Sequence, residues 1–186
     1  MRSFSRFLLR LFGWQIKGSI PADIRKCVII AAPHTSNIDF VIGRLAYYVL
    51  GVSVKFLIKK ESFKGPKGKL LIKMGGIPVD RNRSNNLVDQ IADLFTLAEQ
   101  LNVVITPEGT RKLVKTWKKG YYYIALKANI PIVLGFLDYK RKETGFGPLL
   151  YPSGDYEKDF QEIKTFYEDK TARFPEKFNL SPDHSR

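Results

Sequence analysis

The stretch that decides the fold is CVIIAAPHTSNID, residues 27–39. Its first six residues are apolar and include Val and Ile, as in a buried strand. The apolar run stops at His34-Thr35-Ser36-Asn37-Ile38-Asp39, and Ser36 with Asp39 fits the S-x-x-[DE] signal for the start of a helix. The stretch therefore predicts a strand, a turn and a helix in succession, which is the building unit of an α/β fold.

The same alternation continues along the chain. Short runs rich in Val and Ile predict strands at 27–32, 53–58, 76–80, 102–106 and 131–137. Segments of helical period predict helices at 37–50, 85–101 and 118–129. The helix at 85–101 has the clearest apolar face, formed by Leu87, Ile91, Leu94, Phe95, Ala98 and Leu101. We expect a single α/β domain in which helices flank a mainly parallel central sheet, with a loosely held tail after about Lys170.

The first residues predict an amphipathic helix. One arc of a helical wheel is apolar and consists of Phe4, Phe7, Leu8, Leu11 and Phe12. The opposite arc is basic and consists of Arg2, Arg6 and Arg10. This pattern is typical of a helix that lies in a membrane interface. A helix packed on its own domain is the alternative. We therefore divide the chain into a membrane-interface helix, 1–20, and a main domain, 21–186.

Composition narrows the partners of the protein. A net charge of +13 over 186 residues indicates polyanionic surroundings, either phospholipid headgroups or nucleic acid. Lysines and aromatic residues are interleaved near 59–73 and 112–119, which suits an anionic bilayer surface or a solvated basic face. No apolar run reaches the roughly 20 residues that span a bilayer. The one cysteine, Cys27, excludes an internal disulfide and indicates a buried strand residue.

His34 and Asp39 form a candidate catalytic pair. A histidine exchanges protons near neutral pH, and it does so best when a carboxylate orients its ring. On one regular helix these two side chains would point roughly 140° apart, so His34 must lie on the turn and Asp39 in the helix that follows. The alternative is that Asp39 only caps that helix. The second histidine, His184, lies in a polar tail.

Three further segments lie at predicted strand ends. In GIPVDR, 76–81, a short strand delivers Arg81 to a loop, where a guanidinium suits a phosphate or a carboxylate. In TPEGTR, 106–111, proline ends a strand and Gly109 permits a sharp turn before Arg111. The third, IPIVLG, 130–135, is an apolar strand that also fits a plain core position. Taken singly, the first two segments also fit ordinary charged turns.

Taken in order, H-x4-D, G-I-P-V-D-R, P-E-G-T-R and I-P-I-V resemble four sequence blocks of the glycerophospholipid acyltransferase family, which includes 1-acylglycerol-3-phosphate acyltransferases. The resemblance implies that His34 takes the proton of an acceptor hydroxyl while Asp39 orients its ring, so that the hydroxyl attacks an acyl thioester without a covalent acyl-enzyme. It also implies a phosphate site, formed by Arg81, Glu108, Gly109, Thr110 and Arg111. The segment around Pro131 would belong to an acyl-donor region.

The resulting hypothesis is an O-acyltransferase on the cytoplasmic face of a membrane. Its acyl donor would be acyl-CoA or acyl carrier protein, and its favoured acceptor would be lysophosphatidic acid, with glycerol phosphate and lyso-aminolipids as alternatives. We expect no metal and no redox cofactor. A basic module that binds nucleic acid or a membrane without catalysis is the competing class, but it leaves the H-x4-D and P-E-G-T-R blocks unexplained.

Overall fold

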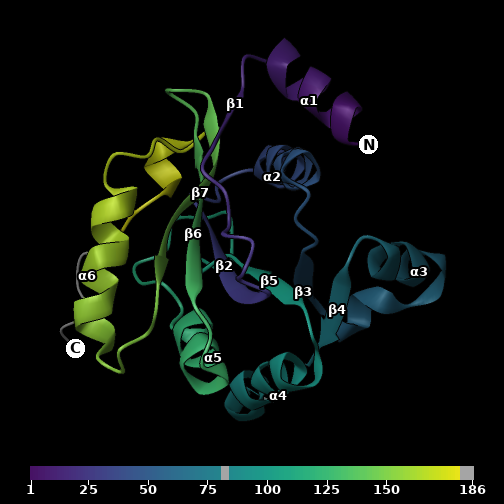
Figure 1. Ribbon diagram of the computed structural model, residues 1–186, viewed down its shortest axis with the longest axis vertical. Helices are drawn as coiled ribbons and strands as arrows, with labels where there is room; N and C mark the ends of the chain where they lie inside the picture. Colours follow the sequence, from purple (N-terminus) through teal and green to yellow (C-terminus); the bar gives the residue numbers. More distant parts are fainter. Residues whose placement is uncertain (81–83, 181–186) are drawn as a thin grey trace.

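A computed structural model describes residues 1–80 and 84–180, and a seven-stranded sheet forms its centre (Figure 1). The strand order is β1-β7-β6-β2-β5-β3-β4. The strands are β1 (Gln15–Lys17), β2 (Lys26–Ala32), β3 (Lys55–Lys59), β4 (Gly76–Val79), β5 (Leu101–Ile105), β6 (Ile132–Asp138) and β7 (Glu143–Leu150). The helices are α1 (Arg2–Leu11), α2 (Asn37–Leu50), α3 (Gly65–Lys73), α4 (Ser84–Leu97), α5 (Gly120–Ala128) and α6 (Tyr156–Tyr167).

The five predicted strands are all present and all parallel to one another. They are β2 to β6, and the crossovers between them run through α2, α3, α4 and α5. The sheet continues beyond β6 with two strands that the sequence did not predict. β7 turns back antiparallel to β6, and β1 then pairs parallel to β7. The mainly parallel sheet and the single α/β domain are therefore confirmed.

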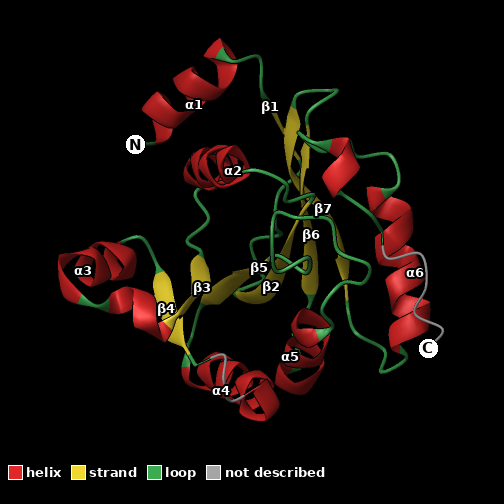
Figure 2. Ribbon diagram, turned by 180° about the vertical axis from the view of Figure 1, so that it is seen from behind, coloured by secondary structure: helices red, strands yellow, loops and turns green. Residues whose placement is uncertain are grey.

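Helices cover the sheet on both faces, as Figures 1 and 2 show. Helices α4, α5 and α6 pack over the larger core, which buries Ile30, Val103 and Leu134 of the central strands. Helix α2 covers the opposite face, where Cys27 and Ile29 are fully buried. Side chains alternate between these faces along each strand, so a central strand that is apolar throughout is covered on both sides.

Two expectations need correction. Helix α4 ends at Leu97, so Ala98 and Leu101 do not continue its apolar face, and Leu101 instead begins β5. The tail beyond Lys170 is held more firmly than expected. Phe178 and Leu180 pack against the larger core, and the indole of Trp117 donates a hydrogen bond of 3.0 Å to the carbonyl of Asn179. These contacts join segments that are far apart in the sequence, so no local sequence pattern predicts them.

Helix α1 lies on α2 rather than apart from the domain (Figure 1). Ser5 and Leu9 are its buried residues, and Trp14 beyond its end is buried beside them. The predicted apolar arc instead faces outward: Phe4, Phe7, Leu11 and Phe12 are 60–65% exposed. In the described residues, no helix is both long enough and apolar enough to cross a membrane.

Candidate active site

The candidate site lies along one edge of the sheet, beyond the carboxyl ends of the parallel strands. His34 follows β2, the segment Thr106–Arg111 follows β5, and Tyr139 follows β6 directly. Because β2 lies between β5 and β6, these three segments meet although they are far apart in the sequence. This edge is where open α/β sheets bind their ligands.

His34 and Asp39 are brought together as predicted. His34 lies on the turn and Asp39 lies in the first turn of α2, and His34 Nδ1 is 3.5 Å from Asp39 Oδ2. The His34 side chain is 19% exposed, whereas that of Asp39 is 2% exposed. The ring therefore contacts the carboxylate through Nδ1, which leaves Nε2 for a substrate. A separation of this size is common for catalytic pairs without substrate, and it shortens when the reactants bind.

The same carboxylate also caps α2. Asp39 Oδ2 accepts hydrogen bonds of 2.7 Å from the amides of Thr35 and Ser36, and Ser36 completes a capping box. Asp39 thus caps α2 and also faces the His34 ring, so the two interpretations of this residue do not exclude each other. Burial alone would raise the pKa of Asp39, but hydrogen bonds from His34, Tyr139, Ser36 and Thr35 outweigh it and lower the pKa. Asp39 is therefore a carboxylate at neutral pH.

Glu108 lies beneath the turn rather than in the open loop. Its side chain is 2% exposed, and its Oε1 accepts a hydrogen bond of 2.7 Å from the amide of His34. Burial raises the pKa of Glu108 to about 8, and the nearby charge of Asp39 acts in the same direction. Glu108 is buried and is not among the described residues that line the pocket. The structure thus does not bring Glu108 into the predicted phosphate site.

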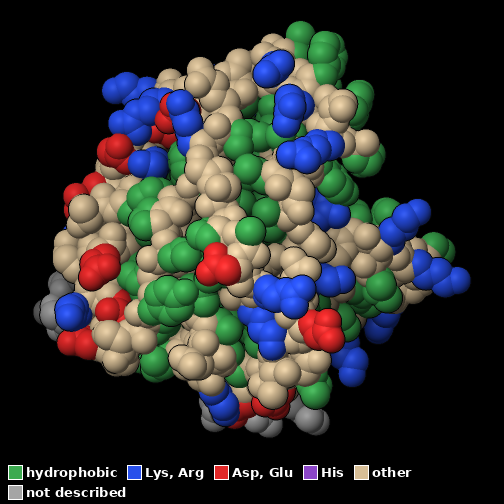
Figure 3. All heavy atoms as spheres, viewed as in Figure 1, with side chains coloured by type: hydrophobic (Ala, Val, Ile, Leu, Met, Phe, Trp, Pro, Cys, Tyr) green, Lys and Arg blue, Asp and Glu red, His purple; other side chains and the backbone are tan. Residues whose placement is uncertain are grey.

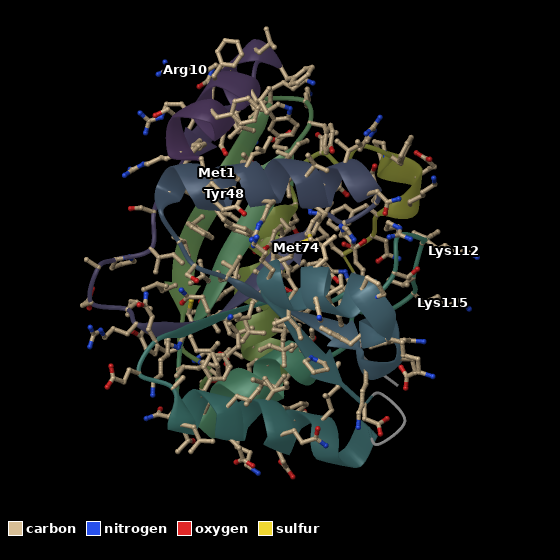
Figure 4. All side chains as sticks on the ribbon, turned by 90° about the vertical axis from the view of Figure 1, so that its right-hand side faces the viewer. Met1, Arg10, Tyr48, Met74, Lys112 and Lys115 are labelled. Carbon is tan, nitrogen blue, oxygen red and sulfur yellow. The ribbon has the colours of Figure 1, made fainter. Side chains whose placement is uncertain are left out.

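The loop after Glu108 is exposed and basic. Gly109 adopts φ +67°, a left-handed conformation that favours glycine, and the turn directs the chain toward Arg111. Arg111 and Lys118 line the pocket described below. The hydroxyl of Thr110 accepts a hydrogen bond from the amide of Lys112, so it shapes the loop. Figure 4 shows the side chains of Lys112 and Lys115 projecting outward from this loop.

A pocket of about 790 Å³ opens beside His34. Its lining comes from both faces of the sheet, because Phe56 and Val104 pack on the α2 side and Leu57 and Ile105 pack on the side of α4 and α5. The lining also includes Phe40 and Tyr47 of α2 and Ile124 of α5. Most of the lining residues are apolar. His34, Asp39 and Arg111 are among the polar ones.

Arg81 and His184 are outside the residues that the structure describes. Pro131 precedes β6 at the opposite edge of the sheet, since its carbonyl accepts a hydrogen bond from Val28 near the start of β2. Pro131 is also not among the described residues that line the pocket. The structure therefore does not bring the predicted acyl-donor residue to His34.

Cys27 is buried in β2, as predicted. Its thiol donates to Asn102 Oδ1 at 3.1 Å, and burial raises its pKa to about 12. The thiol is thus protonated at neutral pH and is a poor nucleophile.

Sequence reasoning missed Tyr139, whose hydroxyl donates a hydrogen bond of 2.6 Å to Asp39 Oδ1. It also missed Arg173, whose guanidinium Nη1 lies 3.5 Å from the hydroxyl of Ser36. Neither belongs to a sequence block, and a lone tyrosine after an apolar strand gives no signal of its own. Only the placement of β6 beside β2 brings Tyr139 to Asp39.

The sequence of this chain matches a known protein family. Residues 15–133 match the Acyltransferase family, and this range includes His34, Asp39 and the loop at 106–111. The match covers more than half of the chain, and the chain belongs to this family.

Two similar proteins agree with this assignment. The human 1-acyl-sn-glycerol-3-phosphate acyltransferase beta is 35% identical over 117 residues, which make up 60% of this chain and 41% of that protein. The chain thus matches well under half of this relative's length. The crystal structure of the 1-acyl-sn-glycerophosphate (LPA) acyltransferase PlsC from Thermotoga maritima has a TM-score of 0.63 and 19% identity, covering 93% of this chain and 79% of that one. At this identity the likeness establishes the shared fold.

Proposed function

We propose that this protein transfers a fatty acyl group from a thioester, acyl-CoA or acyl carrier protein, to the hydroxyl of a lyso-lipid. The observation that carries the proposal is that His34 and Asp39 face each other and both line one pocket whose other lining residues are mostly apolar. An acyl chain needs an apolar enclosure, and acyl transfer needs a base at its reactive end. The names of the similar proteins agree with this chemistry.

The reaction balances with His34 as the only proton carrier. Nε2 of His34 takes the proton of the acceptor hydroxyl as its oxygen bonds to the thioester carbonyl carbon. The C–S bond then breaks, and the leaving thiolate takes the proton from the imidazolium. Asp39 faces Nδ1 at 3.5 Å and stabilises the positive charge that the ring carries in between. The raised pKa of Cys27, at about 12, argues against a cysteine intermediate.

We favour 1-acylglycerol-3-phosphate as the acceptor. Arg111 lines the pocket near His34, and a guanidinium binds a phosphate through paired, charge-assisted hydrogen bonds. Lys118 lines the same pocket and adds a second positive charge. In this proposal Arg111 and Lys118 hold the phosphate with Arg81, while Gly109 and Thr110 shape the loop. Glycerol phosphate and a lyso-aminolipid remain the alternative acceptors.

The test is mass spectrometry of the lipids formed on vesicles from acyl-CoA or acyl carrier protein and a panel of lyso-lipids. We expect a diacylated product, with 1-acylglycerol-3-phosphate preferred, and a loss of about 10²- to 10⁴-fold in turnover for His34→Ala. His184→Ala replaces the only other histidine and is the matched control. Equal product from His34→Ala and the parent would exclude His34 as the base. Vesicle binding with no product from any donor and acceptor would favour a binding module.

We also propose that the protein binds the cytoplasmic surface of a membrane through the outward side of α1. Phe4, Phe7, Leu11 and Phe12 are exposed there, with Arg2, Arg6 and Arg10 on the same helix. Figure 3 shows apolar side chains at the α1 corner of the molecule and basic side chains beside it and along α3. In α3, Leu70 and Ile72 are 58% and 61% exposed, and Figure 4 shows α1, α2 and α3 on one side.

Sedimentation with anionic vesicles tests this surface. Phe4→Ser with Phe7→Ser should lower the partition coefficient at least tenfold, because each buried aromatic side chain contributes about 1.5–3 kcal/mol. Leu97→Ser is the control, since Leu97 is 83% exposed on α4, away from α1 (Figure 1). Equal losses for both changes would contradict a specific role for α1.

A further inference from the structure

Tyr139 lies outside the stretch that matches the family and yet contacts the catalytic pair. It follows the last residue of β6, and its hydroxyl is 2.6 Å from Asp39 Oδ1. β6 is parallel to β2, with Ala32 opposite Phe136. The two chains therefore leave the sheet side by side, and Tyr139 emerges next to the turn that carries His34.

The two oxygens of Asp39 have separate partners. Oδ2 accepts from the amides of Thr35 and Ser36 and faces the His34 ring, whereas Oδ1 accepts from Tyr139. Asp39 is only 3% exposed, so bulk water has little access to replace the tyrosine hydroxyl. A buried carboxylate oxygen that loses its donor is costly to leave unpaired. The bond from Tyr139 therefore opposes rotation of the carboxylate away from His34.

Tyr139 is itself held from two sides. The ring of Trp14 meets it edge to face, with centroids 5.0 Å apart, and the amide of Tyr139 donates a 2.8 Å hydrogen bond to the carbonyl of Thr171. Trp14 is 5% exposed and lies just beyond the C-terminal end of α1, after Phe12 and Gly13. Tyr139 thus joins the base of the N-terminal helix to the carboxylate behind His34.

We propose that Tyr139 is a positioning residue for acyl transfer: through its hydrogen bond to Oδ1 it holds Asp39 in the orientation that directs Oδ2 at Nδ1 of His34. This inference rests on the proposed function, because it assigns a role within that same site. Tyr139 is not among the described residues that line the pocket, and in this proposal it acts through Asp39. Loss of Tyr139 should therefore lower kcat rather than raise KM.

Titratable and charged groups surround Asp39. His34, Tyr139 and Glu108 face the carboxylate, and Arg173 lies beside Tyr139 and Ser36. Burial and the neighbouring Asp39 raise the pKa of Tyr139, so it remains a neutral donor throughout the working range. Without its hydrogen bond, Asp39 Oδ1 loses this donor and the carboxylate is free to turn away from Nδ1 of His34.

Tyr139→Phe is the variant that tests the proposal, since it keeps the ring beside Trp14 and removes only the hydroxyl. We expect kcat to fall about tenfold, with KM changed less than about twofold, as for the loss of one hydrogen bond to a charged group. Tyr151→Phe is the matched control, because Tyr151 is 62% exposed.

A second measurement does not depend on turnover. The chain has two histidines, so imidazole NMR signals recorded in a His184→Ala background report His34 alone. We expect these His34 signals to shift in Tyr139→Phe and to stay unchanged in Tyr151→Phe, because only the first change removes a donor from Asp39. Unchanged His34 signals and an unchanged kcat would overturn the role of Tyr139, even if His34→Ala abolishes product. Full product from His34→Ala would instead overturn the proposed function, and the NMR result would still decide whether Tyr139 acts on the pair.

Discussion

The turn that follows β2 and the loop that follows β5 lie side by side at the same edge of the sheet, but they are built in opposite ways. In the turn, Thr35 and Asp39 are buried, and hydrogen bonds of 2.6–2.7 Å fix the Asp39 carboxylate on both oxygens. In the loop, Gly109, Thr110 and Arg111 are exposed, and Thr110 makes a hydrogen bond of 3.3 Å within the loop itself.

The difference suits the two roles proposed above, proton transfer at the turn and headgroup binding at the loop. A proton transfer needs atoms held within fractions of an ångström, so the turn is fixed by a dense polar network. A charged headgroup can be held by side chains that adjust to it, so exposed cations suffice in the loop. Glu108 joins the two regions, since it belongs to the loop by sequence and to the turn by contact.

The largest effect should come from the turn. We expect Asp39→Asn to lower turnover about 100-fold or more, because the ring loses its orienting charge. Asp39→Ala should in addition lower the free energy of unfolding by about 0.5–2 kcal/mol through the lost helix cap. Steady-state kinetics and urea unfolding separate the two losses. His34→Ala is the comparator, since it should remove activity without the cap penalty, and equal destabilisation by both would contradict the separation.

A smaller effect, on binding, should come from the loop. Arg111→Ala should raise KM for a phosphorylated acceptor about 10-fold or more, the value of one charge-assisted hydrogen bond, with little change in kcat. KM for a neutral acceptor should change far less. Lys112→Ala is the matched control, because Lys112 is exposed and projects away from the domain in Figure 4. If Arg111→Ala lowered kcat for every acceptor alike, the loop would belong to the chemistry.

A third effect, on stability rather than on activity, should appear at the residue that joins the regions. Glu108 has a raised pKa of about 8, so its folded state holds a proton that the unfolded chain has lost, and its contribution to stability falls as pH rises from about 5 to 8. Asp39, with a lowered pKa, has the opposite sign and loses its contribution only in acid. Glu108→Gln keeps the acceptor for the His34 amide and removes the titration.

Thermal unfolding across this pH range tests the sign. Relative to Glu108→Gln, the parent should lose stability with rising pH, by at most about 1.4 kcal/mol per pH unit. Glu157→Gln, at an exposed glutamate on α6, should leave the pH dependence unchanged. A parent that gains stability over the same range would show that Glu108 is ionised when folded.

Much of this comparison was accessible from sequence, because its signals are local. The apolar run at 27–32 predicted β2, and the capping pattern at Ser36 and Asp39 predicted the start of α2 at the residue where it begins. The H-x4-D spacing also placed His34 on the turn and Asp39 in the helix. Strand period, helix caps and short motifs each depend on a few adjacent residues.

The rest depends on contacts between distant segments. β1 has three residues, of which Ile16 alone is a large apolar one, and β7 is interrupted by Gly145, Gly147 and Pro148, so neither shows a strand pattern. Gly145 is needed because β1 passes close by; a Cβ there would lie 1.9 Å from the carbonyl oxygen of Lys17. Tyr139 and Glu108 likewise acquire their roles from strand order, which a motif does not encode.

The double use of Asp39 has a consequence for how substitutions at this site would be tolerated. One carboxylate begins α2 and orients His34, so most replacements at position 39 would reduce both the amount of folded protein and its activity. A selection for abundance alone would therefore retain Asp39 even in a population that no longer needed the reaction. The His34 side chain does not cap a helix in this way. Substitutions would therefore accumulate at position 34 before position 39 once selection for turnover ceased.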